Sequence, residues 1–383
     1  MPDSTLVPAK SPFAATFAEV VEASHAPGYL YSDPQVLARE KEVIFKRDWL
    51  CLCRAEELAE PGDYITFRIV GEPLLLCKDK DGAIKAYANM CLHRGVELAN
   101  GQGKARAFSC PYHGWTYDLE GRLRGAGFMQ DSLGFEKENC RLPEFQVREW
   151  CGWVFVSLAE APRPFEDYIA TFDAKFGWAR MQDMRLGLRM DAELNCNWKL
   201  MVENFIDFYH VKILHKDTIG RFMKTGDVTY DLCENGQVFI DEYDAGTLSK
   251  TGDVFRKRFD TMVDKSPRFS ATGLLPPNVN IFFRPDYVSL FTSWPLGPGR
   301  MKLTTLALWH KDVVEAADFE GVAGEYKVML EKVLGEDFDM VESLQNAAGS
   351  GLFEPGRMSR LERGVQHFVK YSIAKVFEAP KEP

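Results

Sequence analysis

Residues 91–115 read CLHRGVELANGQGKARAFSCPYHGW, and this stretch decides how the first part of the chain is interpreted. It holds two short pairs of potential metal ligands, Cys91 with His93 and Cys110 with His113, with sixteen residues between the pairs. The second pair follows directly on RAFSC, a run that is typical of a short strand. Thiolate and imidazole donors at such close spacing predict a metal site.

A Rieske [2Fe–2S] cluster needs two thiolates on one iron and two imidazoles on the other, and each pair can supply one ligand to each iron. Gly95 and Gly114 follow the pairs, and glycine lets backbone N–H groups approach cluster sulfurs. Two cysteines and two histidines can also hold structural zinc. Zinc sites more often pair like residues, so the sequence favours the cluster.

The composition is that of an ordinary globular protein, with 383 residues, 46% hydrophobic and 27% charged. A net charge of −10 disfavours nucleic-acid binding, and no apolar run approaches the roughly 20 residues of a membrane span. We see no secretory signal, and nine irregularly spaced cysteines fit reduced thiols and metal ligands. We therefore expect a cytoplasmic protein of two or three domains that binds neither nucleic acid nor membrane.

The pattern of elements changes along the chain. Asp33 followed by Pro34 predicts a helix over 34–49, and short strand candidates from about 50 to 158 predict a small all-β domain. The later part predicts helices and strands together, as in an α+β domain with an antiparallel sheet. Its expected elements are a helix over 195–215, a hairpin at Asn235-Gly236, two strands within 279–310, and helices over 322–348 and 357–376. The expected boundaries are an N-terminal segment over 1–44 that packs with the last domain, a cluster domain over 45–158, and that last domain over 159–383.

A second group of potential metal ligands lies in ENFIDFYHVKILH, residues 203–215. Asp207 and His210 share a face of a helix, whereas His210 and His215 lie about 140° apart around it. Both histidines can bind one ion only if the helix widens or ends between them. Two imidazoles and one carboxylate form the facial triad of non-haem Fe(II) oxygenases.

The carboxylate of such a triad must come from elsewhere, because Asp207 is too close to His210 in sequence to be an obvious third ligand. Acidic residues cluster in GEDFDMVESLQNA, where Asp337 is the best candidate and Glu336, Asp339 and Glu342 compete with it. The alternative is a pair of hydrogen-bonded core histidines and a solvated acidic helix start.

Together, CLHRG, CPYHGWTYDLEGRL and NWKLMVENFIDFYHVKILH resemble the oxygenase α subunit of Rieske non-haem iron oxygenases, also called ring-hydroxylating oxygenases. The resemblance covers almost the whole chain and keeps the family's order of motifs. It implies a helix-grip (START-like) catalytic domain, in which a curved antiparallel sheet surrounds a long helix. It also implies cluster ligands Cys91, His93, Cys110 and His113, and mononuclear Fe(II) ligands His210, His215 and Asp337.

The same resemblance implies how the metals cooperate. Asp207 matches an aspartate that links His113 of one subunit to His210 of its neighbour in a homotrimer, and Asn204 matches a position near the iron. Electrons come from a ferredoxin and/or an NAD(P)H-dependent reductase, since the chain has no flavin or nicotinamide motif; Gly101-Gln-Gly103 is interpreted as a turn.

The implied activity is oxygenation of a small aromatic or N-alkyl substrate with O₂. The sequence does not decide among ring dihydroxylation, monohydroxylation and oxidative N- or O-dealkylation. Likeness to members that act on quaternary amines and on N-alkylated xenobiotics favours N-dealkylation. Two other functions stay open at this point. One is a Rieske electron-transfer protein with a non-catalytic ligand-binding domain, and the other is a binding module stabilised by zinc.

Overall fold

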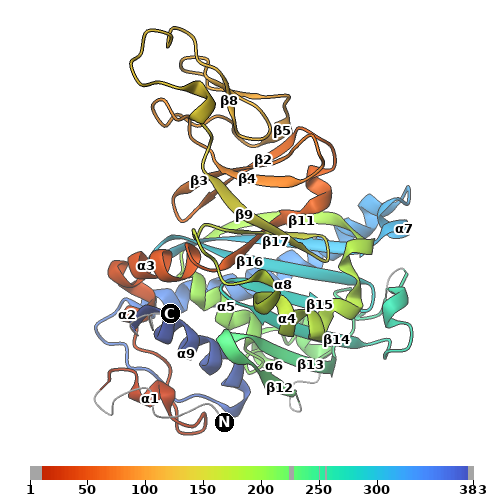
Figure 1. The fold of residues 1–383 in the computed structure, drawn as a ribbon. Helices are drawn as coiled ribbons and strands as arrows, with labels where there is room; N and C mark the ends of the chain where they lie inside the picture. The colour runs from red at the N-terminus through yellow and green to blue at the C-terminus, as the bar shows by residue number, and fades with distance from the viewer. Residues whose placement is uncertain (1–10, 224–227, 250, 255–256, 378–383) are drawn as a thin grey trace. The chain divides into compact units, whose positions relative to one another are not determined.

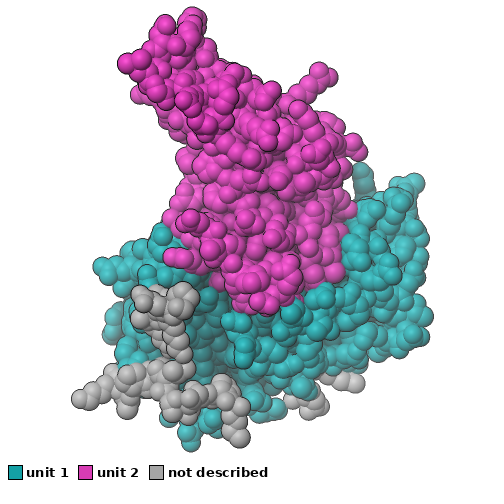
Figure 2. All heavy atoms as spheres, in the orientation of Figure 1, with its two compact units in different colours: residues 1–44, 170–383 teal, residues 45–169 magenta. Residues whose placement is uncertain are grey.

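The computed structural model describes residues 11–223, 228–249, 251–254 and 257–377. The chain forms two compact units (Figure 2). Phe45–Ile169 make up the smaller unit, and the residues before and after this segment make up the larger one. The smaller unit is therefore inserted into the sequence of the larger. Within the described residues, no helix combines the length and the apolar character that crossing a bilayer requires.

The smaller unit is built from antiparallel strands (Figure 1). One seven-stranded sheet has the order β1-β10-β9-β4-β3-β2-β5, and a three-stranded sheet has the order β6-β7-β8. The strands of the first sheet are β1 (Trp49–Arg54), β2 (Asp63–Ile69), β3 (Glu72–Lys78), β4 (Ile84–Ala88), β5 (Gln102–Lys104), β9 (Glu144–Trp150) and β10 (Trp153–Ser157). Those of the second are β6 (Phe108–Ser109), β7 (Thr116–Tyr117) and β8 (Leu123–Gly125). The predicted all-β character is confirmed.

The predicted helix over 34–49 is correct only in its first half. Asp33 caps α3 (Pro34–Glu40) by accepting the Gln35 N–H at 2.8 Å, as its position before a proline predicts. A π-helical turn over Lys41–Phe45 follows, and Trp49 already begins β1 opposite Ser157. Burial of the Trp49 ring in the smaller unit outweighs the helical periodicity, because tertiary packing overrides local preference.

The larger unit contains a seven-stranded antiparallel sheet of order β11-β17-β16-β15-β14-β13-β12. Its strands are β11 (Met184–Leu194), β12 (Tyr230–Leu232), β13 (Val238–Asp244), β14 (Phe269–Leu275), β15 (Val279–Phe283), β16 (Tyr287–Gly297) and β17 (Arg300–His310). The hairpin around Asn235-Gly236 is confirmed, with both residues at positive φ. Three strands replace the two expected over 279–310, because Pro285 lacks the N–H that a continuous strand needs.

Helices from both ends of the sequence meet in the larger unit. They are α1 (Ala14–Phe17), α2 (Tyr29–Ser32), α3, α5 (Trp198–Ile206), α6 (Val211–Leu214), α7 (Lys311–Val314), α8 (Phe319–Ala348) and α9 (Arg363–Phe377), while α4 (Phe165–Phe176) crosses the boundary in sequence. α2 packs on α8, and α1 and α3 pack on α9. α5 lies against β14 to β17 and against α8. The α+β prediction is confirmed.

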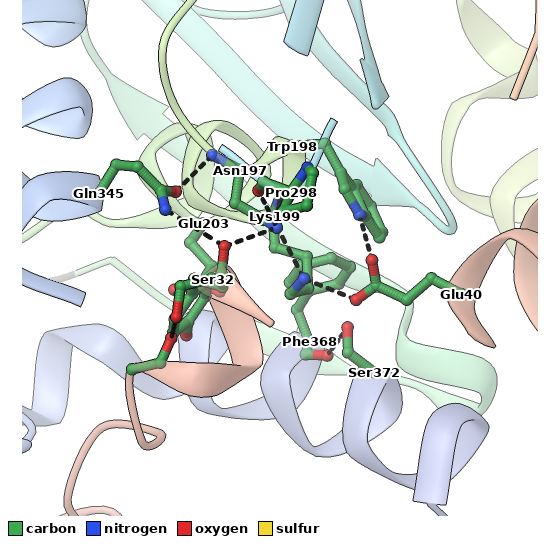
Figure 3. A network of polar contacts seen from close by, with 12 residues as sticks. Ser32, Glu40, Asn197, Trp198, Lys199, Glu203, Pro298, Gln345, Phe368 and Ser372 are labelled. Carbon is green, nitrogen blue, oxygen red and sulfur yellow. Dashed lines mark hydrogen bonds and ion pairs between the residues drawn. The ribbon is translucent and has the colours of Figure 1, made fainter. Parts of the chain in front are cut away.

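A buried polar network fixes the start of α5 (Figure 3). Asn197 caps the helix by accepting the Lys199 N–H at 3.1 Å, and its amide donates to the carbonyls of Tyr31 (3.0 Å) and Pro298 (2.8 Å). The fully buried ammonium of Lys199 lies 2.6 Å from Glu40 Oε1. α5 is thereby anchored to the N-terminal segment.

Candidate metal centres

The two Cys/His motifs form loops with the same backbone hydrogen bonds. The N–H of each cysteine donates to the carbonyl five residues later, at 2.8 Å from Cys91 and 2.7 Å from Cys110. The N–H groups of Gly95 and Gly114 donate back to these cysteines at 2.8 and 3.0 Å. Both glycines have positive φ, 74° and 71°, which other residues rarely adopt. The two loops therefore present their side chains in equivalent ways.

The donor atoms of these loops suit a [2Fe–2S] cluster. The Nδ1 atoms of His93 and His113 lie 3.1 Å apart, and both rings are exposed. Cys91 and Cys110 are buried beneath them, with 3% and 4% of their surface exposed. Paired imidazole nitrogens at the surface and paired thiols below match the two-iron arrangement of a Rieske centre.

Tyr117, which the motif analysis did not single out, contacts this site. Its hydroxyl lies 3.4 Å from Cys91 Sγ and accepts the N–H of Leu92 at 2.9 Å. Burial and the bond to Cys91 raise the pKa of Tyr117 well above its usual value, so the phenol remains protonated and can donate to a thiolate. Only the fold could reveal this contact, because Tyr117 lies on β7, outside the two Cys/His pairs.

The helix predicted over 195–215 is interrupted at the second site. α5 ends at Ile206, and Asp207 is extended, with φ −88° and ψ 111°. Asp207 Oδ1 accepts the N–H of Tyr209 at 2.7 Å, a local turn that competes with continued helix. The short α6 then begins after His210 and ends before His215. The break brings the two histidines to one side, so their rings lie 5.2 Å apart between centroids.

Three potential ligands converge at this break. One donor atom from each of His210, His215 and Asp337 lies within 4.8 Å of the other two. Asp337 Oδ1 is 3.0 Å from His215 Nε2 and 3.6 Å from His210 Nε2. The aspartate projects from α8, is 3% exposed, and its Oδ1 lacks a hydrogen bond of acceptable geometry. A buried carboxylate oxygen with this deficit fits a cation that the two imidazoles share.

Outer carboxylates orient both rings. His210 Nδ1 lies 2.9 Å from Asp207 Oδ2, and His215 Nδ1 lies 2.7 Å from Glu336 Oε2. An imidazole that donates from Nδ1 keeps the Nε2 lone pair for a metal, and both Nε2 atoms face Asp337. Glu336 therefore has a supporting position, which adjacency to Asp337 in sequence could have suggested.

The other acidic candidates lie apart from the converging atoms. Asp339 is exposed, and Glu342 accepts the backbone N–H of Asn195 at 2.8 Å. Asn204 lines the same cavity as the three ligands. The remaining wall of this cavity is mostly apolar and aromatic, from α5, α6, α8, β15, β16 and the segments next to them: Phe205, Phe208, Val211, Ile219, Met223, Leu248, Phe282, Arg284, Tyr287, Ser289, Phe291, Leu330, Val333 and Leu334.

Comparison with known families agrees with this architecture. Residues 48–142 match the Rieske [2Fe–2S] domain, and residues 181–376, just over half of the chain, match the ring hydroxylating alpha subunit (catalytic domain). The chain belongs to the ring-hydroxylating α-subunit family of Rieske oxygenases. Members hold a Rieske [2Fe–2S] cluster and a mononuclear iron, so the cofactor prediction is confirmed at this level.

Among curated relatives, the carnitine monooxygenase oxygenase subunit of Acinetobacter pittii is 37% identical over 192 residues, 49% of this chain and 52% of that protein. The chain thus spans about half the length of this relative. The glycine betaine monooxygenase oxygenase subunit of Pseudomonas aeruginosa is 27% identical over 380 residues, 90% of this chain and 87% of that protein.

Solved structures confirm the fold class. The quaternary ammonium Rieske monooxygenase CntA in complex with L-carnitine superposes with a TM-score of 0.79 at 25% identity, covering 96% of this chain and 98% of that one. Naphthalene 1,2-dioxygenase from Rhodococcus gives 0.75 at 22% identity, with 93% and 95% covered, and shows the fold alone. The expected Rieske domain and helix-grip domain with a curved antiparallel sheet are both confirmed.

Proposed function

We propose that this chain is the terminal oxygenase subunit of a multicomponent Rieske oxygenase. It uses O₂ and electrons from a ferredoxin and/or an NAD(P)H-dependent reductase to hydroxylate or oxidatively N-dealkylate a small aromatic or N-alkyl compound. The convergence of His210, His215 and Asp337 at an apolar cavity carries the proposal. An electron-transfer protein, the alternative function, needs no second metal site.

The ligand roles follow from the donor atoms. In this proposal Cys91, His93, Cys110 and His113 hold the [2Fe–2S] cluster. The mononuclear iron is held by His210, His215 and Asp337, and when bound it supplies the open coordination positions at which O₂ is activated.

The chain's own side chains prepare this chemistry. Asp207 and Glu336 keep His210 and His215 in the tautomer whose Nε2 is free for a metal. The apolar wall excludes water from the reacting centre, and Asn204 adds a polar group beside it. We assign Asp207 the further role of linking His210 to His113 of another subunit in a homotrimer. Its side chain, 20% exposed, leaves that carboxylate accessible.

Among these reactions we favour oxidative N-dealkylation, on the strength of two relatives. The carnitine and glycine betaine monooxygenases match this chain over 192 and 380 residues. We place the protein in the cytoplasm, and its nine cysteines, all within the described residues and none in a disulfide, agree with a reducing compartment.

Asp337→Ala tests the proposed iron site. We expect the variant to keep the visible absorbance of its cluster but to lose most of its mononuclear iron. Its substrate-dependent O₂ uptake should fall by about a hundredfold or more, because one of the three proposed iron ligands is missing. Iron analysis, absorbance and O₂ uptake with reconstituted reductase measure these effects. Mass spectrometry with labelled O₂ identifies the product.

Asp339→Ala is the matched control, since Asp339 lies two residues further along α8 and is exposed. It should behave like the wild type. Normal iron content and turnover in Asp337→Ala would show that the proposed ligand set is wrong.

A further inference from the structure

Three cationic side chains are buried among the residues that the structure describes, and they differ in how their charge is balanced. Lys199 lies 2.6 Å from Glu40, and Arg54 lies 3.6 Å from Glu56. Arg284, only 6% exposed, forms no ion pair with any described carboxylate. A buried cation without an anionic partner is unfavourable, so its presence calls for an explanation.

Arg284 lies in the wall of the cavity that holds the proposed iron ligands. It follows β15 directly, and its backbone N–H donates to the Tyr287 carbonyl at 2.9 Å, which closes the turn into β16. Its guanidinium lies over the rings of Tyr243 and Phe282, 5.7 and 5.8 Å from their centroids. The turn and the two rings fix the position of the charge.

The direct partners of this guanidinium are neutral. Nη1 donates to the Tyr243 hydroxyl at 3.0 Å, and the Tyr287 hydroxyl is its other side-chain partner. Burial raises the pKa of Tyr287, so this phenol stays protonated. The nearest acid in sequence, Asp286, is hydrogen-bonded by Thr247 at 2.5 Å and by Tyr326. A guanidinium has five N–H donors, so the two phenols leave part of its capacity unused.

We infer that Arg284 binds a carboxylate group of the substrate. The inference rests on the proposed oxygenase function and narrows its substrate to small carboxylates with an apolar or N-alkyl body. The planar guanidinium fork matches a carboxylate in geometry, and the low polarity of the cavity strengthens the pair. Phe205, Phe291, Leu330 and Val333 provide the apolar surface for the rest of the molecule.

The positive charge of Arg284 also disfavours compounds that lack a carboxylate. A cation that lacks a carboxylate gains no such pair and meets the positive charge of the guanidinium. A zwitterion with an N-alkyl ammonium is accepted, because its carboxylate pairs with Arg284 and its methyl groups contact the aromatic wall. Arg284 is thus a specificity-determining residue.

Binding to the resting holoenzyme, loaded with both metals and without reductant, tests the inference apart from catalysis. Calorimetry compares phenylacetate with phenylacetamide, and glycine betaine with choline, which are pairs that differ in the carboxylate. We expect at least one carboxylate to bind about tenfold or more tightly than its partner, as a charge-assisted bidentate pair requires. Arg284→Met, which keeps the apolar volume, should reduce this preference below about twofold.

Two further variants keep the result interpretable. Arg300→Met removes an exposed arginine of the same unit and should leave the preference unchanged. If Arg284→Met fails to fold, Arg284→Lys replaces it: the charge remains but the fork is lost, so carboxylates should bind several-fold more weakly while still being preferred. A wild type without any carboxylate preference, or a preference that survives in Arg284→Met, would overturn the inference.

O₂ uptake with a reductase separates this inference from the proposed function. If only neutral or cationic compounds stimulate uptake, the protein is an oxygenase and the carboxylate site is wrong. If carboxylates bind through Arg284 but no compound stimulates uptake, the anion site stands and the oxygenase function fails.

Discussion

At the scale of single residues, Asp207 has two structural roles at the second metal site. It ends α5 and accepts the Tyr209 N–H, and it holds His210 through Nδ1. One carboxylate thus sets the course of the backbone and the orientation of a proposed metal ligand. The Asp207 side chain is still 20% exposed, so its carboxylate can also contact another subunit.

Asp207→Ala separates metal binding from electron delivery. With excess Fe(II), we expect the variant to retain much of both metals, because neither proposed ligand set is touched. Multiple turnover should fall by about a hundredfold or more, while a single turnover of pre-reduced enzyme survives in part. Rapid-quench and steady-state assays distinguish the two. The exposed Asp217→Ala is the control, and normal steady-state turnover in Asp207→Ala would refute the bridging role.

The sequence could identify those functional residues that stand together in short motifs, but not those that only the fold brings together. The proposed ligands of the cluster stand in two short motifs, so they could be predicted from spacing. Asp337 is more than a hundred residues from His215, so its sequence position made it only the best of several competing acidic residues, and the family resemblance supported it further. Arg284 stands in no motif, and nothing in the motif around Tyr117 marks its contact with Cys91, because these contacts depend on which side chains the sheets bring together.

At the scale of elements, α5 is held by polar contacts more than its apolar sequence suggests. Glu40 Oε1 pairs with Lys199 at 2.6 Å, and Glu40 Oε2 accepts the indole N–H of Trp198 at 2.8 Å (Figure 3). These contacts join α3 to α5 across 158 residues of sequence. The sequence predicted both helices but not this link, and the Asp207 turn likewise escaped the periodicity of 195–215.

Breaking this buried pair should destabilise the larger unit strongly. We expect Glu40→Ala to lower its free energy of unfolding by about 3–5 kcal/mol, because it leaves the Lys199 charge buried and unpaired. The double variant Glu40→Leu/Lys199→Met removes both charges and should cost less than Glu40→Ala alone. Denaturant unfolding measures both. Glu40→Leu and Lys199→Met are measured alone as well, and a double variant as unstable as their sum would mean that the pair is not coupled.

At the scale of the whole molecule, a buried carboxyl group and a histidine make the stability depend on pH. Glu203 on α5 is 8% exposed and accepts the Tyr31 hydroxyl at 3.2 Å. Burial raises the pKa of Glu203 to about 7, although His25, Tyr31 and Lys199 oppose the shift and Glu362 adds to it. His25 lies 3.1 Å from Glu362, and the Glu362 carboxylate outweighs burial to raise the pKa of His25.

The raised pKa values of Glu203 and His25 both make the folded protein less stable as the pH rises. Glu203 binds its proton more tightly in the folded state than at the ordinary carboxyl pKa of 4.5, so folding stability should fall as pH rises from about 4.5 to 7. His25 stabilises most below its ordinary value of 6.5 and loses that contribution at higher pH. Between pH 5 and 8, we expect Glu203→Gln to reduce the change in the free energy of unfolding by up to about 3 kcal/mol. Unfolding curves across this range test it, and an unchanged slope would exclude Glu203 as the source.

The insertion of one unit into the other constrains how the protein is made. α2 and α3 leave the ribosome early, yet they pack on α8 and α9, some 300 residues later in the sequence. At about 5–20 residues per second, the first helices wait on the order of tens of seconds for their partners. The inserted strands of Phe45–Ile169 can pair during that interval. The proposed cluster site can therefore be complete before the proposed iron site is made, and a truncated product should retain the cluster colour without the iron site.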